Sequence, residues 1–123
     1  MLITAKVPVR LVNALNQREH WAVKAKRARE QRGAAAAAMI SARPGWVFDC
    51  DLVAAGDPPI TVTITRRGGR RMDDDGLTAS AKHVRDGVAD WLGIDDGDPR
   101  LTWIVKQDKA PRGQHWVDVE AIA

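Results

Sequence analysis

The sequence predicts an α+β fold, with a single domain over residues 1–123 in which a small mixed β-sheet of about four to five strands packs against two main helices. Several short segments alternate apolar and polar residues, which is typical of half-buried strands. Two longer segments have the composition or the apolar spacing of helices. With 123 residues, 45% of them hydrophobic, the chain is long enough for one core but not for two.

The N-terminal half predicts a strand, a long helix and a second short strand. Residues 2–9 alternate in polarity, and Pro8 indicates a sheet edge or the end of a strand. Residues 17–41 are rich in Ala, Lys, Arg, Glu and Gln and predict a helix, with a weak point at Gly33. A short strand is expected at residues 46–52, within a segment punctuated by Pro and Gly.

The C-terminal half predicts a strand, a helix and two further strands. Residues 60–66 alternate Ile or Val with Thr, which indicates a half-buried strand. From Leu77 onward apolar residues recur every three or four positions up to Gly93, which predicts an amphipathic helix with a glycine stop. Residues 101–107 and 115–123 alternate again, and a turn between them predicts a C-terminal hairpin. Both helices are expected on one face of the sheet.

Composition restricts the classes of function. Cys50 is the single cysteine, which excludes an intrachain disulfide and a zinc site built on cysteines, and favours a reducing compartment. No run approaches the roughly 18 apolar residues of a membrane helix, and Lys6 and Arg10 stand where a signal peptide would be apolar. We therefore expect a cytoplasmic protein with no membrane partner and no small-molecule cofactor.

Charged residues are segregated along the chain, although the net charge is only +3. Six Lys and Arg residues lie between residues 18 and 32, four Arg residues between 66 and 71, and eight Asp residues between 73 and 98. This pattern is expected of a polyanion-binding surface around a carboxylate site. For the cations of the first helix, a solvated helix face is an equally good interpretation.

Three consecutive aspartates, Asp73 to Asp75, lie at the predicted start of the second helix. Aspartate is favoured there because it caps the helix and meets the positive end of its dipole. Capping uses only one or two of the three, so the excess charge indicates either a bound cation or ion pairs with the neighbouring arginines. Both interpretations stay open on this cluster alone.

A second acidic group, Asp95 and Asp96, lies beyond the same helix. A helix of about 16 residues is roughly 24 Å long, so the two groups share an ion only if the chain after Gly93 turns back. Lys82 and Asp86 are four residues apart and, with Asp75, fall near one helix face. Lys82 could therefore steady a carboxylate or meet a scissile phosphate, or form an exposed ion pair.

Other kinds of site have less support. Ser80 and His83 lack an evident third partner for a hydrolytic triad, and the segment RRGGRR lacks the spacing and the Lys-Ser/Thr ending of a P-loop. A Mg²⁺ site made of carboxylates and flanked by arginines remains. Such an ion polarises a phosphate and helps to deprotonate a water, as phosphodiester cleavage requires.

These residues resemble the RusA family of Holliday-junction resolvases, which are common in prophages. The family has a D-x-D-N-L motif between a strand with a basic end and a helix, then a Lys and an Asp four residues apart, then an acidic pair. The corresponding segments here are DDDGL at 73–77, KHVRD at 82–86 and DD at 95–96, and LNQREHW at 15–21 is similar to the family's entry to the first helix. The resemblance covers most of the chain.

The resemblance implies a RusA-like fold and a Mg²⁺-dependent endodeoxyribonuclease that resolves four-way junctions or other branched DNA by paired symmetric nicks, with Mn²⁺ as a substitute ion. It implies a homodimer, because two symmetric nicks need two related sites, in a bacterial or phage-infected cell. The implied catalytic residues are Asp73, Asp75, Asp96 and Lys82; the metal ligands are Asp73, Asp75, Asp96 and Asp95; and the DNA contacts are Arg66, Arg67, Arg70, Arg71, Arg18 and Lys24.

The sequence departs from the family motif in two places. Gly76 replaces the motif's Asn, and Lys82 lies seven residues after Asp75, where four is typical. The alternative is a non-catalytic DNA-binding protein of the same fold, in which the aspartates only cap a helix.

Overall fold

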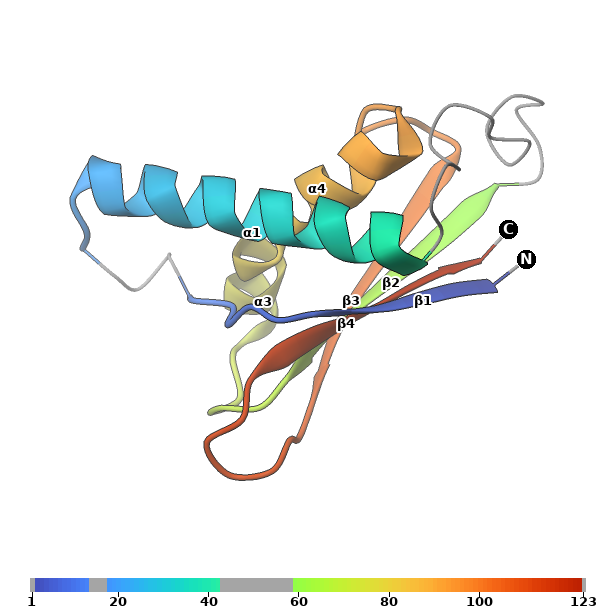
Figure 1. Cartoon of the computed structure of the whole chain (residues 1–123). Helices are drawn as coiled ribbons and strands as arrows, with labels where there is room; N and C mark the ends of the chain where they lie inside the picture. Colours follow the sequence, from blue (N-terminus) through green and yellow to red (C-terminus); the bar gives the residue numbers. More distant parts are fainter. Residues whose placement is uncertain (1, 14–17, 43–58, 123) are drawn as a thin grey trace.

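A four-stranded mixed sheet carries the helices on one of its faces (Figure 1). The computed structural model describes residues 2–13, 18–42 and 59–122, and the strand predicted at 46–52 lies outside these residues. The described part has four strands and three helices, which confirms the predicted α+β class. In chain order these are β1 (Leu2–Val7), α1 (Trp21–Ala42), β2 (Ile60–Arg67), α3 (Asp74–Ser80), α4 (Lys82–Leu92), β3 (Leu101–Asp108) and β4 (Trp116–Ile122).

The strand order is β1-β4-β2-β3. β4 runs antiparallel to both of its neighbours, whereas β2 and β3 are parallel. The prediction of a C-terminal hairpin is therefore wrong, since β2 lies between β3 and β4. Residues 109–115 are enough to cross one intervening strand, because a step of two strand spacings is only about 10 Å. Among the described strands β1 lies at one edge of the sheet, and it ends just before Pro8, as predicted.

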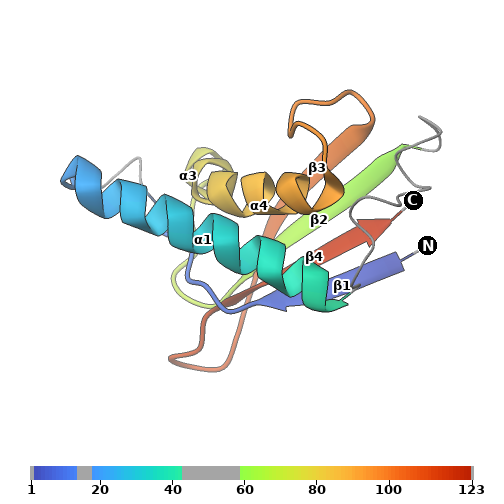
Figure 2. The same ribbon diagram turned by 45° about the horizontal axis from the view of Figure 1, so that its top comes forward.

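The parallel pair places two carboxyl ends side by side. Arg66 of β2 lies opposite Gln107 of β3, and Arg67 lies opposite Asp108. The helices α3 and α4 make the crossover between these strands (Figure 2). Loops that follow parallel strands in such a unit meet at one edge of the sheet, which is a common place for a binding site.

The helix predicted from Leu77 to Gly93 is two helices that join at Ala81. The hydroxyl of Ser80 donates to the carbonyl of Leu77 at 2.7 Å, and such a back-bond often bends a helix. α3 begins earlier than predicted, because the Asp73 side chain caps it by accepting from the Gly76 N–H at 2.8 Å. Gly93 ends α4 with a φ of 74°, as predicted.

α1 continues through Gly33 without a break, so the predicted weak point is not present. Its first half is largely exposed, with Trp21 75% and Val23 51% exposed, and in Figure 1 this half extends beyond the sheet. Its buried residues, Gln31, Ala35 and Met39, lie from the middle of the helix onward. The helix therefore belongs to the core at one end only.

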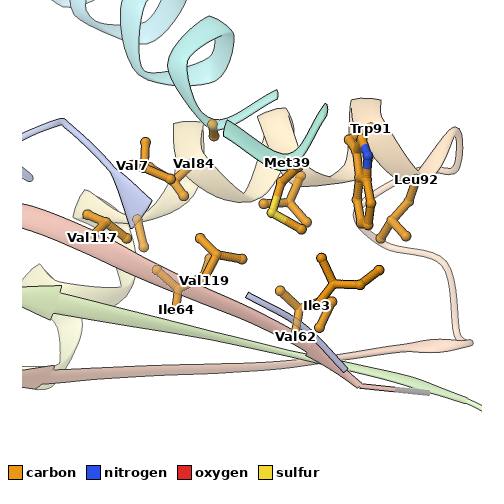
Figure 3. Packing of buried hydrophobic residues seen from close by; sticks show 14 of the residues in the cluster. Ile3, Val7, Met39, Val62, Ile64, Val84, Trp91, Leu92, Val117 and Val119 are labelled. Carbon is orange, nitrogen blue, oxygen red and sulfur yellow. The ribbon is translucent and has the colours of Figure 1, made fainter. Parts of the chain in front are cut away.

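The core lies between the sheet and the helices (Figure 3). Val62, Ile64 and Val119 of the sheet face Met39 and Trp91 of the helices, and each of these five is at most 1% exposed. All the apolar positions predicted for the second helix are buried: Leu77, Ala81, Val84, Val88, Trp91 and Leu92. Among the described residues, no helix is both long and apolar enough to cross a membrane.

Candidate nucleic-acid interface

A cleft of about 550 Å³ opens beside the start of α3, and we call it the arginine cleft. It is lined by Arg10, Leu11, Val12, Asn13, Arg27, Arg66, Arg70, Arg71, Met72 and Asp73. Five arginines thus meet from three separate parts of the chain: the segment after β1, the helix α1, and β2 with its following loop. Such a concentration of guanidinium groups is suited to phosphate groups, which arginine binds with two parallel hydrogen bonds.

Gln107 holds the loop that carries two of these arginines. Its side-chain amide accepts from the Met72 N–H at 3.0 Å and donates to the Met72 carbonyl at 2.7 Å. The same Gln107 oxygen accepts from Arg66 Nη1 at 3.3 Å. One side chain of β3 therefore fixes the backbone immediately before Asp73 and contacts the guanidinium inside the cleft.

Gly68 and Gly69 make the turn between β2 and this loop, with φ values of 91° and 73°. Such angles favour glycine. A Cβ at Gly68 would collide with the Gln114 carbonyl, and one at Gly69 would lie 2.6 Å from Arg66 Nη2. Gly68 therefore lets the turn pass close to the Gln114 backbone, and Gly69 lets it pass close to the Arg66 side chain.

Arg66 and Arg67 lie on opposite faces of the sheet. Arg66 is 6% exposed and lines the arginine cleft, where burial and the nearby Arg10 lower its pKa. Arg67 contacts Asp118 at 2.9 Å and Asp108 at 3.0 Å, and lines a different pocket, on the face without helices. The structure thus separates Arg67 from the other three arginines of the segment.

The cations predicted on the first helix also lie apart from the arginine cleft. Arg18 and Lys24 are exposed and do not line it. Arg27, one turn beyond Lys24, does line it, and its guanidinium is bound to Glu19. Sequence reasoning missed Arg10, Asn13, Arg27 and Gln107, which come from three separate parts of the chain: the segment after β1, α1 and β3. The general enrichment in arginine pointed toward Arg10 and Arg27, and no signal in the sequence pointed toward Asn13 and Gln107.

The three aspartates occupy the start of α3. Asp73 is the N-cap and lines the arginine cleft, while Asp74 and Asp75 lie exposed in the first turn. A Cβ at Gly76 would lie 2.5 Å from both Asn13 Nδ2 and Asp73 Oδ1. The Asn13 side chain therefore packs against position 76, and a larger residue there would displace it.

A second charged cluster surrounds Lys82. Its ammonium lies 2.8 Å from Asp86 and 2.9 Å from Asp96, and Arg85 is 3.7 Å from Asp96. The Trp103 indole N–H also donates to the Asp96 carbonyl at 2.8 Å. The chain after Gly93 thus turns back toward Lys82, the first residue of α4, but the shared-ion hypothesis required Asp95 or Asp96 to reach the aspartates at 73–75. The hydrogen bond from Lys82 lowers the pKa of Asp96.

The predicted metal ligands are not gathered at one point. Within the described ranges, no three His, Cys, Asp or Glu side chains are close enough to hold a metal ion together. Asp96 is held by Lys82, and Asp95 is exposed next to it. Asp73 and Asp75 remain as exposed oxygen donors beside the arginine cleft. They fit Mg²⁺ chemically, because this ion commonly takes one or two carboxylates and completes its shell with water and substrate phosphates.

No family model matches the sequence. The chain is similar to an uncharacterized protein of Xylella fastidiosa, with 35% identity over 81 residues, which is 66% of this chain and 51% of that protein. The chain thus spans about half the length of this relative.

Proposed function

We propose that the protein is a Mg²⁺-dependent, structure-selective endodeoxyribonuclease that resolves four-way junctions or other branched DNA by paired symmetric nicks. One observation carries the proposal. Asp73, the N-cap of α3, lines the same cleft as five arginines, so a hard-oxygen ligand and a phosphate-binding surface adjoin. This juxtaposition is expected of phosphodiester cleavage, where the cations hold the backbone and the carboxylates hold the ion.

In this proposal each group has a separate role. Arg10, Arg70 and Arg71 hold phosphates that flank the scissile bond, and their removal weakens binding without regard to sequence. Asp73 and Asp75 hold the ion, which when bound polarises the phosphate and acidifies a water; Mn²⁺ serves as a substitute. Lys82 keeps Asp96 charged and in place. A homodimer supplies the second nick.

The test is the cleavage of a labelled four-way junction by the Asp75→Asn variant. We expect nicking in Mg²⁺ to fall by at least about 10²-fold, while junction binding persists or improves because a negative charge is lost. Asp74→Asn is the matched control, since it removes the same charge from the next residue of the exposed first turn and should nick at the wild-type rate. Wild-type nicking by Asp75→Asn would refute the assignment.

The second candidate is a non-catalytic DNA-binding protein in which the aspartates only cap α3. It is favoured by the Lys82 ammonium, which already neutralises Asp96 at 2.9 Å and so takes the place that an ion would need. This candidate predicts equal junction binding in Mg²⁺ and in EDTA, without nicks in either. Paired nicks that appear only with the divalent ion would eliminate it.

A further inference from the structure

We propose that the arginine cleft contains a discrete oxyanion site, centred on the Arg66 guanidinium, that binds a single phosphate group without a metal ion. The inference deepens the proposed function and rests on it for the source of that phosphate, a nucleic-acid strand. It adds Arg10, which the sequence did not indicate, and it separates Arg66, which binds the anion, from its neighbour Arg67, which is structural.

The first argument is the uncompensated charge of Arg66. In the described part of the chain its side chain donates to a neutral amide oxygen, that of Gln107 at 3.3 Å, and no carboxylate there pairs with it. Burying a charge is unfavourable unless an opposite charge accompanies it. A buried arginine of this kind is expected where an anionic ligand completes the site.

The second argument is the charge around Arg66. Arg10, Arg70 and Arg71 line the same cleft, and Arg10 is close enough to add to the lowering of the Arg66 pKa that burial begins. Arg27 is already bound to Glu19, and Asp73 is the one acidic residue of the lining. Cations that repel one another around a cleft indicate that an anion belongs between them.

The third argument is that Arg66 is held in place. Gln107, which accepts from its Nη1, is itself fixed by two hydrogen bonds to Met72, and Gly69 packs closely against its Nη2. A guanidinium that is already ordered loses little further freedom when it binds a phosphate.

Arg67 provides the internal comparison. It is the next residue of the same strand, but its guanidinium lies between Asp108 and Asp118, at 3.0 and 2.9 Å. Its charge is therefore satisfied within the chain. Two neighbouring arginines with opposite surroundings allow the site to be tested with matched variants.

The experiment titrates inorganic phosphate in EDTA, at constant ionic strength set with sodium chloride, and follows the unfolding midpoint and the calorimetric affinity. We expect phosphate to raise the midpoint of the wild type, and Arg66→Gln to weaken phosphate binding by about tenfold or more. Arg67→Gln should keep the wild-type affinity. Equal affinities of the wild type and the Arg66→Gln variant, or no stabilisation beyond that given by chloride, would overturn the inference.

A second variant, Arg10→Gln, tests the site independently if Arg66→Gln folds poorly. Arg10 is exposed, so Arg10→Gln should fold normally. Without phosphate it should be more stable than the wild type, because a repulsion on Arg66 is removed, yet it should bind phosphate several-fold more weakly. Unchanged phosphate affinity in Arg10→Gln would contradict the proposed site.

Two small probes distinguish the two possible sources of the phosphate, the backbone of a strand and the end of a strand. Thymidylyl-thymidine, which has one internal phosphodiester, tests a backbone phosphate, and thymidine 5′-monophosphate tests a strand end. Binding of either probe by the wild type but not by Arg66→Gln supports the site. If the wild type binds neither probe, the inference is overturned. These measurements involve no cleavage. A protein that binds phosphate through Arg66 but never nicks DNA would refute only the proposed nuclease, and a nuclease with unchanged phosphate affinity in Arg66→Gln would refute only this site.

Discussion

At the scale of single residues, the role of a charged side chain depends less on its charge than on the groups that surround it. Arg66 and Arg67 have the same chemistry, yet one is buried against a neutral amide and the other lies between two carboxylates. The alternation of a strand already implied that they face opposite sides. The carboxylates that meet Arg67 could not be foreseen, because they belong to β3 and β4, whose pairing with β2 depends on the whole sheet.

Gln107 is an uncharged residue whose hydrogen bonds hold both the loop at Met72 and the Arg66 guanidinium in the arginine cleft. Gln107→Leu removes two hydrogen bonds to Met72 and the contact with Arg66, so we expect the free energy of unfolding to fall by about 1–3 kcal/mol. Denaturant unfolding measures this change. Gln114→Leu is the control, since the Gln114 side chain is exposed, and it should change stability by at most about 0.5 kcal/mol. Equal effects of the two substitutions on stability would contradict the role of Gln107 in holding the loop at Met72.

Asp98 gives a prediction for acid unfolding. Its hydrogen bonds with Arg100 lower its pKa from 3.8 to about 2. A carboxylate with a depressed folded-state pKa stabilises the fold above its unfolded pKa, and this contribution is lost as the pH falls through the folded value. Asp98→Asn should therefore be less stable than the wild type at neutral pH, and the difference should shrink between about pH 4 and pH 2. A difference independent of pH would contradict this role.

At the scale of elements, the contact between α1 and α4 depends on small residues. A Cβ at Gly87 of α4 would lie 2.7 Å from the Ala35 Cβ and would collide with the Arg32 carbonyl. Near this contact, Arg32 and Asp90 form a two-point ion pair at 2.6 and 2.7 Å. The small side chain of Ala35 therefore serves close helix packing, which the sequence alone did not indicate.

Two glycines in helix interiors should respond to alanine in opposite directions. Gly87→Ala is expected to destabilise the protein by about 1–3 kcal/mol, because the added methyl group overpacks the contact with α1. Gly33→Ala in α1 should stabilise it by roughly 0.5–1 kcal/mol, since nothing lies within 4 Å of the added atom. Thermal unfolding of both variants checks the pair, and a common sign for the two changes would refute the packing argument.

Periodicity predicted which segments form strands and helices better than it predicted which of these elements lie side by side. The period-two pattern of β2 and the apolar spacing of α4 were confirmed, because each follows from which face is buried. The strand order was missed, since local alternation does not say which strand lies beside which. The bend at Ala81 was also missed, because the hydrogen bond from Ser80 that accompanies it is invisible to apolar spacing.

At the scale of the whole molecule, the segregation of charge along the sequence becomes two separate centres in space. The arginine cleft collects cations from three parts of the chain, and the Lys82 cluster pairs its charges internally. The sequence predicted that both signs would meet near α3. It did not predict that Lys82 would already hold Asp96, because this contact depends on the path of the chain after Gly93.

The salt dependence of DNA binding distinguishes arginines that contact DNA phosphates from arginines that are already paired with a carboxylate. If DNA phosphates contact the arginine cleft, Arg70→Gln should reduce the slope of the logarithm of the binding constant against the logarithm of salt concentration by about 1. Arg32→Gln should leave this slope unchanged, because Arg32 is already paired with Asp90. Fluorescence titrations at several salt concentrations measure both slopes, and a loss of slope in Arg32→Gln alone would contradict the cleft as the contact surface.

The place of β4 in the sheet has a consequence for synthesis. Within the described part of the sheet β1 pairs with β4 alone, so Leu2 meets Ile122, and β4 also fills the space between β1 and β2. During translation β1 therefore meets β4 only after about 110 more residues have been made, since Val7 pairs with Val117. Contacts of such long range are formed slowly. An incomplete chain on the ribosome would expose the edge of β1 that β4 later covers, and this part of the sheet would close in a late step that joins β1 to β4.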